Sequence, residues 1–267
     1  MKRLIYFVTV LGLAAATGAY AQVSTINSAI ITTRVFNDVP GATGTYPNNY
    51  PASIGLGESG MSAATGYANR DVWQFSNNGG TSAYQFQNGD YFNASFRLTL
   101  TGSGTSGIDL EAGWLFSNPS GSIGGDLQSI VKADGEVVQF GGPSYFGFSP
   151  ANGGTSVPNY TLGATYTLGL NYVLDPNTGR NAFQYSVNGV FATSSPGNTY
   201  FDLAAGAGPN GSPLGGYLQI QNDPNNPSNN GSALFDTISI SPSTVPEPAT
   251  FSLLGLGMLA LLYRRRR

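Results

Sequence analysis

ASFRLTLT, residues 94–101, alternates apolar and polar side chains, and this alternation decides the fold class. Ala94, Phe96, Leu98 and Leu100 fall on one face of an extended chain, because successive side chains of a strand point to opposite sides. The same period of two recurs along most of the chain, while the 3.6-residue period of a helix is nearly absent. It predicts eleven strands, at residues 26–36, 72–75, 94–101, 108–116, 127–133, 136–140, 166–174, 183–187, 190–192, 217–221 and 233–240.

Turn-forming residues separate these strands. Asp134-Gly135 and Asn188-Gly189 are typical of two-residue hairpins, since a type I′ turn needs positive φ at both positions. Stretches rich in Gly, Pro, Asn, Ser and Thr are predicted to be surface loops, at 37–68, 149–159, 198–213 and 222–231. Many short strands without a repeat of fixed period predict an all-β antiparallel sandwich over residues 22–241, rather than a solenoid or βαβ units.

The composition excludes most catalytic chemistry. The 267 residues include no Cys and no His, so the chain offers no thiol or imidazole for nucleophilic, acid–base or metal chemistry. Between its two ends, five basic residues accompany fourteen acidic ones, a net charge of −9. Five scattered cations cannot neutralise a run of phosphates, so no nucleic-acid partner is expected.

The two ends of the chain have the pattern of targeting signals. A basic start precedes an apolar stretch, and Ala19 and Ala21 form a small-x-small cleavage site, which predicts a signal peptide over residues 1–21. Near the other end, residues 242–248 form a predicted tether and residues 249–263 a predicted transmembrane helix. A basic cluster at 264–267 follows and favours the cytoplasmic side of the membrane. It consists of Arg264, Arg265, Arg266 and Arg267.

This C-terminal arrangement resembles a known sorting signal. Val245, Pro246, Glu247 and Pro248 precede the apolar segment and the arginines, in the three-part order of the PEP-CTERM signal of Gram-negative bacteria. The resemblance implies that the tail is held in the inner membrane, recognised by the transpeptidase exosortase, and cut near the Pro-Glu-Pro motif. The protein would then reach the cell surface or the exopolysaccharide matrix. An unprocessed membrane anchor is the alternative.

The body is similar to a concanavalin-like, or laminin-G-like, jelly roll. The order of its strands and hairpins carries this resemblance, together with the closing LFDTISI at 234–240. Laminarinase-type glycosidases on this sandwich carry Glu-x-Asp-x-Glu along one strand. Asp109 and Glu111 match the last two acids, but Gly107 stands where the nucleophile should be. The resemblance therefore implies the fold, while this departure removes the covalent glycosidase step.

Four residues are candidate ligand contacts, each with a purely structural alternative. Asp109 and Glu111 share a strand face, where they could act as paired carboxylates or lie on a solvated face of the sheet. Trp73 and Tyr145 could stack on sugar rings or pack in the core.

A calcium ion is the one cofactor that the sequence leaves open. Asp175 and Asn177 lie in one oxygen-rich loop and Asp223 in another, and oxygen ligands suit calcium. The same residue types are ordinary turn formers, which is the alternative interpretation.

Together, these observations favour a non-enzymatic exported protein of the cell surface or extracellular matrix, in contact with exopolysaccharide. Two alternatives stay open: a carbohydrate-binding lectin-like module, with or without calcium, and a divergent glycosidase. A concave face lined by aromatic residues and carboxylates would favour the first alternative. Two carboxyl groups roughly 5 Å apart in a cleft would favour the second.

Overall fold

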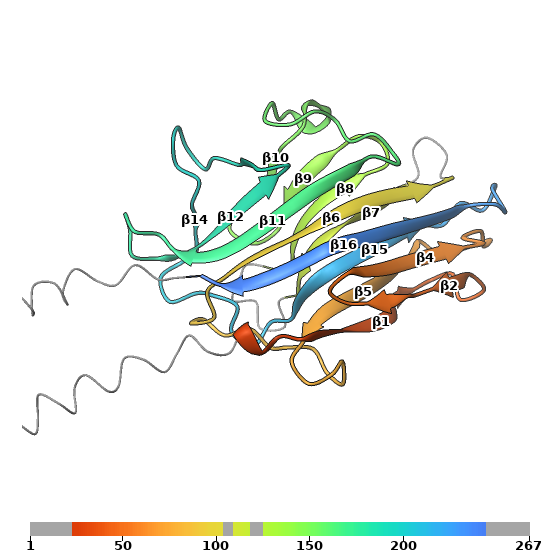
Figure 1. Ribbon diagram of the computed structural model, residues 1–267. Coiled ribbons are helices and arrows are strands. Elements are labelled where there is room, and N and C mark those ends of the chain that lie inside the picture. The colour runs from red at the N-terminus through yellow and green to blue at the C-terminus, as the bar shows by residue number, and fades with distance from the viewer. Residues whose placement is uncertain (1–22, 104–108, 118–124, 244–267) are drawn as a thin grey trace, which may run out of the picture.

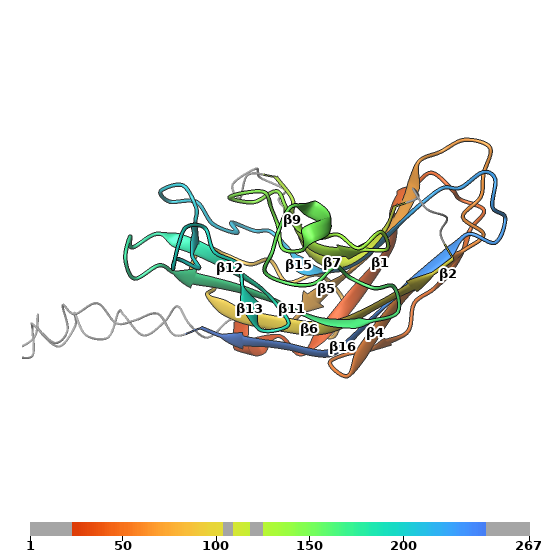
Figure 2. The same ribbon diagram turned by 90° about the horizontal axis from the view of Figure 1, so that it is seen from above.

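The computed structural model describes residues 23–103, 109–117 and 125–243, which fold as two antiparallel sheets packed face to face (Figure 1). Figure 2 shows the sheets as two layers, seen from above. The seven-stranded sheet has the order β1 (Ser28–Asn37), β5 (Ala68–Ser76), β15 (Leu214–Gln221), β7 (Leu110–Phe116), β8 (Leu127–Lys132), β9 (Val137–Phe140), β10 (Phe146–Gly147).

The nine-stranded sheet forms the other layer. Its order is β13 (Val190–Phe191), β12 (Asn181–Val187), β11 (Thr165–Leu174), β6 (Phe92–Gly102), β16 (Asn230–Pro242), β4 (Ser53–Ser59), β2 (Thr43–Thr45). Beside this path, β14 (Phe201–Asp202) pairs with β12 and β3 (Asn48–Asn49) pairs with β4. Short 3-10 turns lie at Val23–Thr25 and Pro150–Asn152. The predicted sandwich is confirmed, and each of the eleven predicted strands overlaps a strand of the structure.

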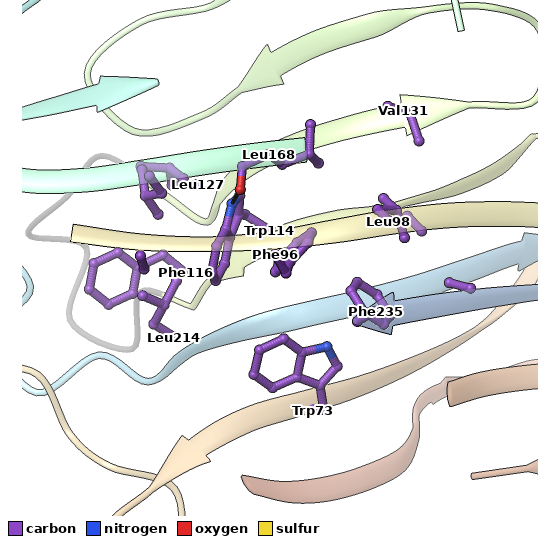
Figure 3. Packing of buried hydrophobic residues seen from close by; sticks show 14 of the residues in the cluster. Trp73, Phe96, Leu98, Trp114, Phe116, Leu127, Val131, Leu168, Leu214 and Phe235 are labelled. Carbon is purple, nitrogen blue, oxygen red and sulfur yellow. Dashed lines mark hydrogen bonds between the residues drawn. The ribbon is translucent and has the colours of Figure 1, made fainter. Parts of the chain in front are cut away.

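The core between the sheets is built from aromatic side chains of both layers (Figure 3). The ring of Phe96 on β6 lies 4.1 Å from that of Trp114 on β7, and Phe235 on β16 lies 5.7 Å from Trp73 on β5. The Trp114 indole N–H donates to the carbonyl of Leu168, 3.2 Å away, so one sheet is hydrogen-bonded to the other through the core. Such edge-to-face and tilted contacts stabilise the core beyond the area that they bury.

One glycine is required by this packing. Gly216 on β15 pairs with Trp73 across the sheet, and a Cβ there would lie 2.5 Å from the indole nitrogen and 2.7 Å from the ring of Phe235. Any larger residue would push two core rings apart.

The prediction of a surface loop over residues 37–68 is wrong. This segment contains β2, β3 and β4, and Ile54 and Leu56 of β4 are fully buried. Ile54, Leu56 and Glu58 alternate as a strand requires, but glycines at 55 and 57 occupy the opposite face, and glycine usually marks a loop. The predicted loops at 149–159 and 198–213 likewise contain a 3-10 turn and β14.

The two predicted hairpin turns differ from each other. Asn188 and Gly189 have φ of 51° and 78°, as a type I′ turn requires, so this prediction is confirmed. At the other hairpin only Gly135 has positive φ, 103°, and the Lys132 N–H donates to the Glu136 carbonyl at 2.9 Å. That hairpin therefore has a three-residue loop with glycine in the left-handed position, and the two-residue prediction is wrong there.

A buried ionic cluster joins the two sheets at one end of the sandwich. Arg34 on β1 donates from Nε to Glu58 Oε1 on β4 at 2.9 Å, and its backbone N–H donates to Asp71 Oδ1 on β5 at 2.7 Å. The Tyr46 hydroxyl donates to the same Glu58 oxygen at 2.6 Å. Glu58 and Asp71 are both buried, so this cluster ties β4 of one sheet to β1 and β5 of the other.

Candidate functional site

A line of polar side chains crosses the outer face of the seven-stranded sheet. Arg70 on β5 pairs with Gln219 on β15, Gln219 pairs with Glu111 on β7, and Glu111 pairs with Lys132 on β8. Directly opposed residues of an antiparallel pair share a face, so these four side chains form one row across four strands. We call Arg70, Gln219, Glu111 and Lys132 the polar row.

Hydrogen bonds link three members of the row. Arg70 Nε donates to Gln219 Oε1 at 2.8 Å, and Gln219 Nε2 donates to Glu111 Oε1 at 3.2 Å. The Arg70 guanidinium also lies 5.1 Å from the centre of the Tyr217 ring, a cation–π distance. The Tyr217 hydroxyl donates to Glu111 Oε1 at 3.0 Å. These contacts hold the row in one arrangement.

Burial and neighbouring charges change the pKa of three groups here. Burial raises the pKa of Glu111, although its hydrogen bond from Tyr217 opposes this. Burial and then the Glu111 carboxylate raise the pKa of Tyr217 well above its usual value of 10. Burial lowers the pKa of Lys132, but hydrogen bonds to Glu136 and Asp109 outweigh it and raise that pKa. Tyr217 and Lys132 therefore keep their protons at neutral pH.

Lys132 is held by three carboxylates. Its Nζ lies 3.0 Å from oxygens of Asp109 and Glu136 and 3.5 Å from Asp134. Lys132 lies directly opposite Glu111 in the sheet, and its ammonium group binds Asp109. Asp109 and Glu111 therefore lie on the same face, as predicted. Their environments differ: Glu111 is 8% exposed, whereas the side chain of Asp109 is 37% exposed.

One end of the row opens onto exposed aromatic rings. Gln221 Nε2 donates to Asp109 Oδ2 at 2.9 Å and to the Tyr67 hydroxyl at 2.8 Å. The Tyr67 ring lies 6.0 Å from that of Phe36, which pairs with Arg70 across the sheet. Tyr67 is 53% exposed and Phe36 38% exposed. We call Phe36 and Tyr67 the aromatic edge; it is a surface on which a flat apolar ligand face could lie.

Sequence reasoning missed most of this site. It singled out Asp109 and Glu111 but not Arg70, Gln219 or Tyr67. A local signal did exist for one part, because Gln219 and Gln221 alternate with buried Leu218 and Ile220 inside a predicted strand. The sequence held no such local signal for Arg70, since its partner Gln219 is 149 residues away in the chain.

Trp73 and Tyr145 lie in opposite environments. Trp73 is fully buried among Phe75, Phe96 and Phe235, so the suggestion that it stacks on a glycan is wrong for this fold. Tyr145, by contrast, is 59% exposed and lines a depression beside β10. The Tyr145 ring is therefore accessible for stacking. It lies beside β10, at the opposite edge of the seven-stranded sheet from β1 and the aromatic edge.

The calcium candidates are turn residues in the structure. Asp175 Oδ1 accepts the N–H of Asn177 at 2.7 Å, and Asp223 Oδ1 accepts the N–H of Asn225 at 3.0 Å. Both are side-chain turns of the kind that Asp forms locally. Within residues 23–103, 109–117 and 125–243, acidic residues gather in no group of three that could hold a metal ion. Calcium binding stays untested.

The targeting segments lie outside the described residues. This applies to the signal peptide with Ala19 and Ala21, the Pro-Glu-Pro motif, the segment 249–263, the four arginines, and Gly107. In the part of the chain that is described, no helix has the length and apolarity needed to cross a membrane.

The fold and the tail together define a class: a β-sandwich body joined to a C-terminal sorting signal. The PEP-CTERM protein-sorting motif matches residues 244–267, so the resemblance seen in the sequence is confirmed. This motif implies processing by an exosortase, export, and sorting to the cell surface. No curated protein matches the chain in sequence.

Solved structures identify the sandwich as concanavalin-like. Alginate lyase PA1167 from Pseudomonas aeruginosa is similar with a TM-score of 0.52 and 12% identity, over 74% of this chain and 86% of that chain. The alginate lyase from Corynebacterium sp. (TM-score 0.46, 14% identity, 81% and 94% covered) and the carbohydrate recognition domain of Emp47p (0.41, 11%, 82% and 90%) score lower. The shared fold therefore rests on the Pseudomonas enzyme, and at this identity it concerns the fold alone.

Proposed function

We propose that this chain is a non-enzymatic protein of the cell surface or extracellular matrix that contacts polysaccharide through the outer face of its seven-stranded sheet. The observation that carries this proposal is the polar row with its aromatic edge. Tyr67 and Phe36 offer an apolar surface for the CH face of a sugar, and Arg70, Gln221 and Asp109 offer groups that bond hydroxyls beside it.

The state of the titratable groups in the row supports binding without catalysis. A general base must be free to take a proton within hydrogen-bond reach of its substrate. Tyr217 is fully buried and donates a hydrogen bond to Glu111, while Lys132 is protonated and surrounded by three carboxylates. Glu111 is buried beneath its bonds from Tyr217 and Gln219. Asp109 is more open than Glu111, but it is bonded by Lys132 and Gln221.

A polysaccharide-cleaving enzyme is the second candidate. A buried carboxyl with a raised pKa, here Glu111, is a common form of acid catalyst. The fold shared with an alginate lyase makes alginate a natural first substrate to test. This candidate would require the row to open, because Glu111 is only 8% exposed and its Oε1 already accepts hydrogen bonds from Tyr217 and Gln219.

One experiment separates the two candidates. We expect the full-length chain to bind at least one polysaccharide among alginate, laminarin, agarose, carrageenan and the exopolysaccharide of the producing cell, without shortening it. Tyr67→Ala should lower the affinity about 2- to 13-fold, since a ring contact contributes about 0.5–1.5 kcal/mol. The measurement is an array of immobilised polysaccharides, with and without chelator, followed by chromatography of the polymer.

The matched control is Leu234→Ala. Leu234 is 45% exposed on β16 of the other sheet, so it has similar exposure but does not lie on this face. Equal binding by the two variants, or no binding at all, would contradict the proposal. Shortened polymer that disappears in Glu111→Gln would establish the enzyme instead. Binding that the chelator abolishes would show that calcium is required for it.

The processing of the precursor gives an independent prediction. We expect mass spectrometry of the mature protein to show an N-terminus at Gln22 and loss of residues 251–267, because the sorting signal is cut near Pro-Glu-Pro. Neutral replacements of Arg264 to Arg267 should reduce this processing, since the positive-inside bias holds the tail in orientation. Mature protein that retains the arginines would favour an unprocessed anchor.

A further inference from the structure

A second place in the fold is built like a ligand site. A depression of about 320 Å³ lies at the edge of the sandwich, where β10 of the seven-stranded sheet approaches β13 and β14 of the nine-stranded sheet. We call it the edge pocket; its lining includes Ser144, Tyr145, Phe146, Thr193, Phe201 and Asp202. Its volume is at the lower end of the range of small-ligand sites, enough for one sugar ring or two.

Aromatic rings form the rigid part of the edge pocket. Phe146 and Phe201 stack at 4.7 Å with their planes 18° apart, which joins the edges of the two sheets. Tyr145 packs against Phe140 at 5.2 Å and exchanges hydrogen bonds with the side-chain amide of Asn152 at 3.0 and 2.8 Å. A ring that is fixed on one side and 59% exposed offers a ready stacking face.

Polar atoms without partners surround these rings. Ser144 Oγ and Asp202 Oδ1 are both buried, and neither has a hydrogen-bond partner among the described residues. The same holds for the hydroxyl of Tyr185, whose ring packs against Phe146 at 5.5 Å and Phe201 at 5.2 Å. Leaving such an atom unpaired costs about 1–3 kcal/mol. Of these residues Ser144 and Asp202 line the edge pocket itself, so a molecule bound there lies next to two side chains that have unused hydrogen-bonding capacity.

The chemistry of the lining selects the kind of molecule. The carboxylate oxygens of Asp202 accept hydrogen bonds, so the ligand must donate to them, whereas Ser144 and Thr193 can do either. No basic side chain is among the described residues that line the pocket, so nothing there favours an anionic ligand. A donor-rich ring with an apolar face is a neutral sugar.

We propose that the edge pocket binds a neutral sugar unit, with Tyr145 stacking on the ring and Asp202 accepting hydrogen bonds from its hydroxyls. This site is separate from the aromatic edge of the polar row. The edge pocket lies at β10, the last strand of the seven-stranded sheet, whereas Phe36 lies on β1 at the opposite edge of that sheet. Two sites on one displayed module would let it hold two glycan segments together, which raises the avidity for a polymer without new contacts.

The test uses the full-length chain and small sugars that cannot span both sites. Calorimetry and saturation-transfer NMR would measure binding of the methyl glycosides of glucose, galactose and mannose, with glucuronate as the charged probe. We expect at least one neutral glycoside to bind more tightly than glucuronate. Tyr145→Ala and Asp202→Ala should each weaken its affinity about 10-fold or more.

Two controls keep the outcome clear. Tyr67→Ala removes the other exposed tyrosine and should leave methyl glycoside binding unchanged, whereas it weakens polysaccharide binding if the proposed function holds. Tyr145 is largely exposed, so its replacement tests the pocket without risk to the fold. Absence of glycoside binding up to the solubility limit, which would mean water alone fills the pocket, overturns the proposal. So does binding that Tyr145→Ala and Asp202→Ala leave intact.

Discussion

Replacing Arg34 with Met is expected to lower the free energy of unfolding by about 3–5 kcal/mol, because it leaves the buried carboxylate of Glu58 without its cation. Arg34 donates from Nε and one terminal nitrogen to the two oxygens of Glu58, at 2.9 and 3.1 Å. The Glu58 side chain is 1% exposed. Asp71 accepts the backbone N–H of residue 34, which Met retains, so the loss falls on Glu58.

The guanidinium also satisfies backbone carbonyls. It donates to Pro40 at 3.0 Å and to Ala42, both in the segment before β2. Arg34 itself has φ of 52° at a register shift of β1, so its side chain departs from the regular alternation of the strand. Met keeps the length and apolar stem of the side chain, so the decrease in the free energy of unfolding reports the contribution of the charge and its hydrogen bonds.

The matched control is Arg97→Met. Arg97 pairs with Asp236 at 3.5 Å, but both side chains are partly exposed, 51% and 25%. Solvent screens such a pair, which contributes about 0–1 kcal/mol. Urea unfolding of the two variants at pH 7 makes the comparison, and a difference between them of less than 1 kcal/mol would contradict the assignment of Arg34 to a buried ionic cluster.

Replacing Asp71 with Asn is expected to stabilise the protein at pH 8, by about 2–3 kcal/mol. Burial, and then the Glu58 carboxylate, raise the pKa of Asp71 from its usual 3.8 to about 6. Its Oδ1 accepts the backbone N–H of Arg34, whereas its Oδ2 is buried and accepts no hydrogen bond from the described residues. Asn keeps the first bond and removes the buried charge.

The sign of the pH dependence follows from the raised pKa. The folded state holds the Asp71 proton more tightly than the unfolded state, so the carboxyl is neutral in both below pH 3.8 and its contribution is then complete. That contribution is lost as the pH rises from about 3.8 to about 6, and above this the ionised group destabilises the fold. Arg34, Glu58 and Tyr46 are the charged and titratable groups of the cluster around it.

Urea unfolding from pH 4 to pH 8 measures this dependence. The native chain should lose stability over that range more steeply than Asp71→Asn. The control is Asp90→Asn: Asp90 is also buried, but its Oδ2 accepts bonds from the Tyr84 hydroxyl and the Gln87 N–H, at 2.9 and 2.8 Å. It should show no gain at pH 8. If the free energy of unfolding changed with pH equally in the native chain and in Asp71→Asn, Asp71 would be excluded as the source of the pH dependence.

The strands were largely predictable because the period of two is a local property. Phe96, Leu98 and Leu100 on β6 are buried, whereas Arg97 and Thr99 between them are not, as the alternation predicts. Strand β4 was not predicted because Gly55 and Gly57 occupy its outer face, and glycines in a sequence usually mark loops. The turn at Gly135 was also mispredicted. The dipeptide Asp-Gly occurs both in turns with two residues of positive φ and in turns with one, and here only Gly135 has positive φ.

The candidate sites were much less predictable. The aromatic residues illustrate this, because Trp73 and Tyr67 lie six positions apart and one is fully buried while the other is half exposed. Which ring faces solvent depends on the second sheet that covers it, and that sheet comes from distant segments. Tyr145 was recognised as a candidate, but its pocket partners Phe201 and Asp202 lie in a segment that was predicted to be a loop.

The amino-acid sequence by itself determined the sorting signal, the lack of thiol and imidazole chemistry, and the all-β class, because each of these depends on composition or on neighbouring residues. Only the tertiary structure decided which polar groups meet. Arg70, Gln219, Glu111 and Lys132 form one row because β5, β15, β7 and β8 are neighbours in the sheet in an order that differs from their order in the chain. Strand order and register arise from burying both inner faces at once, so they are properties of the whole chain.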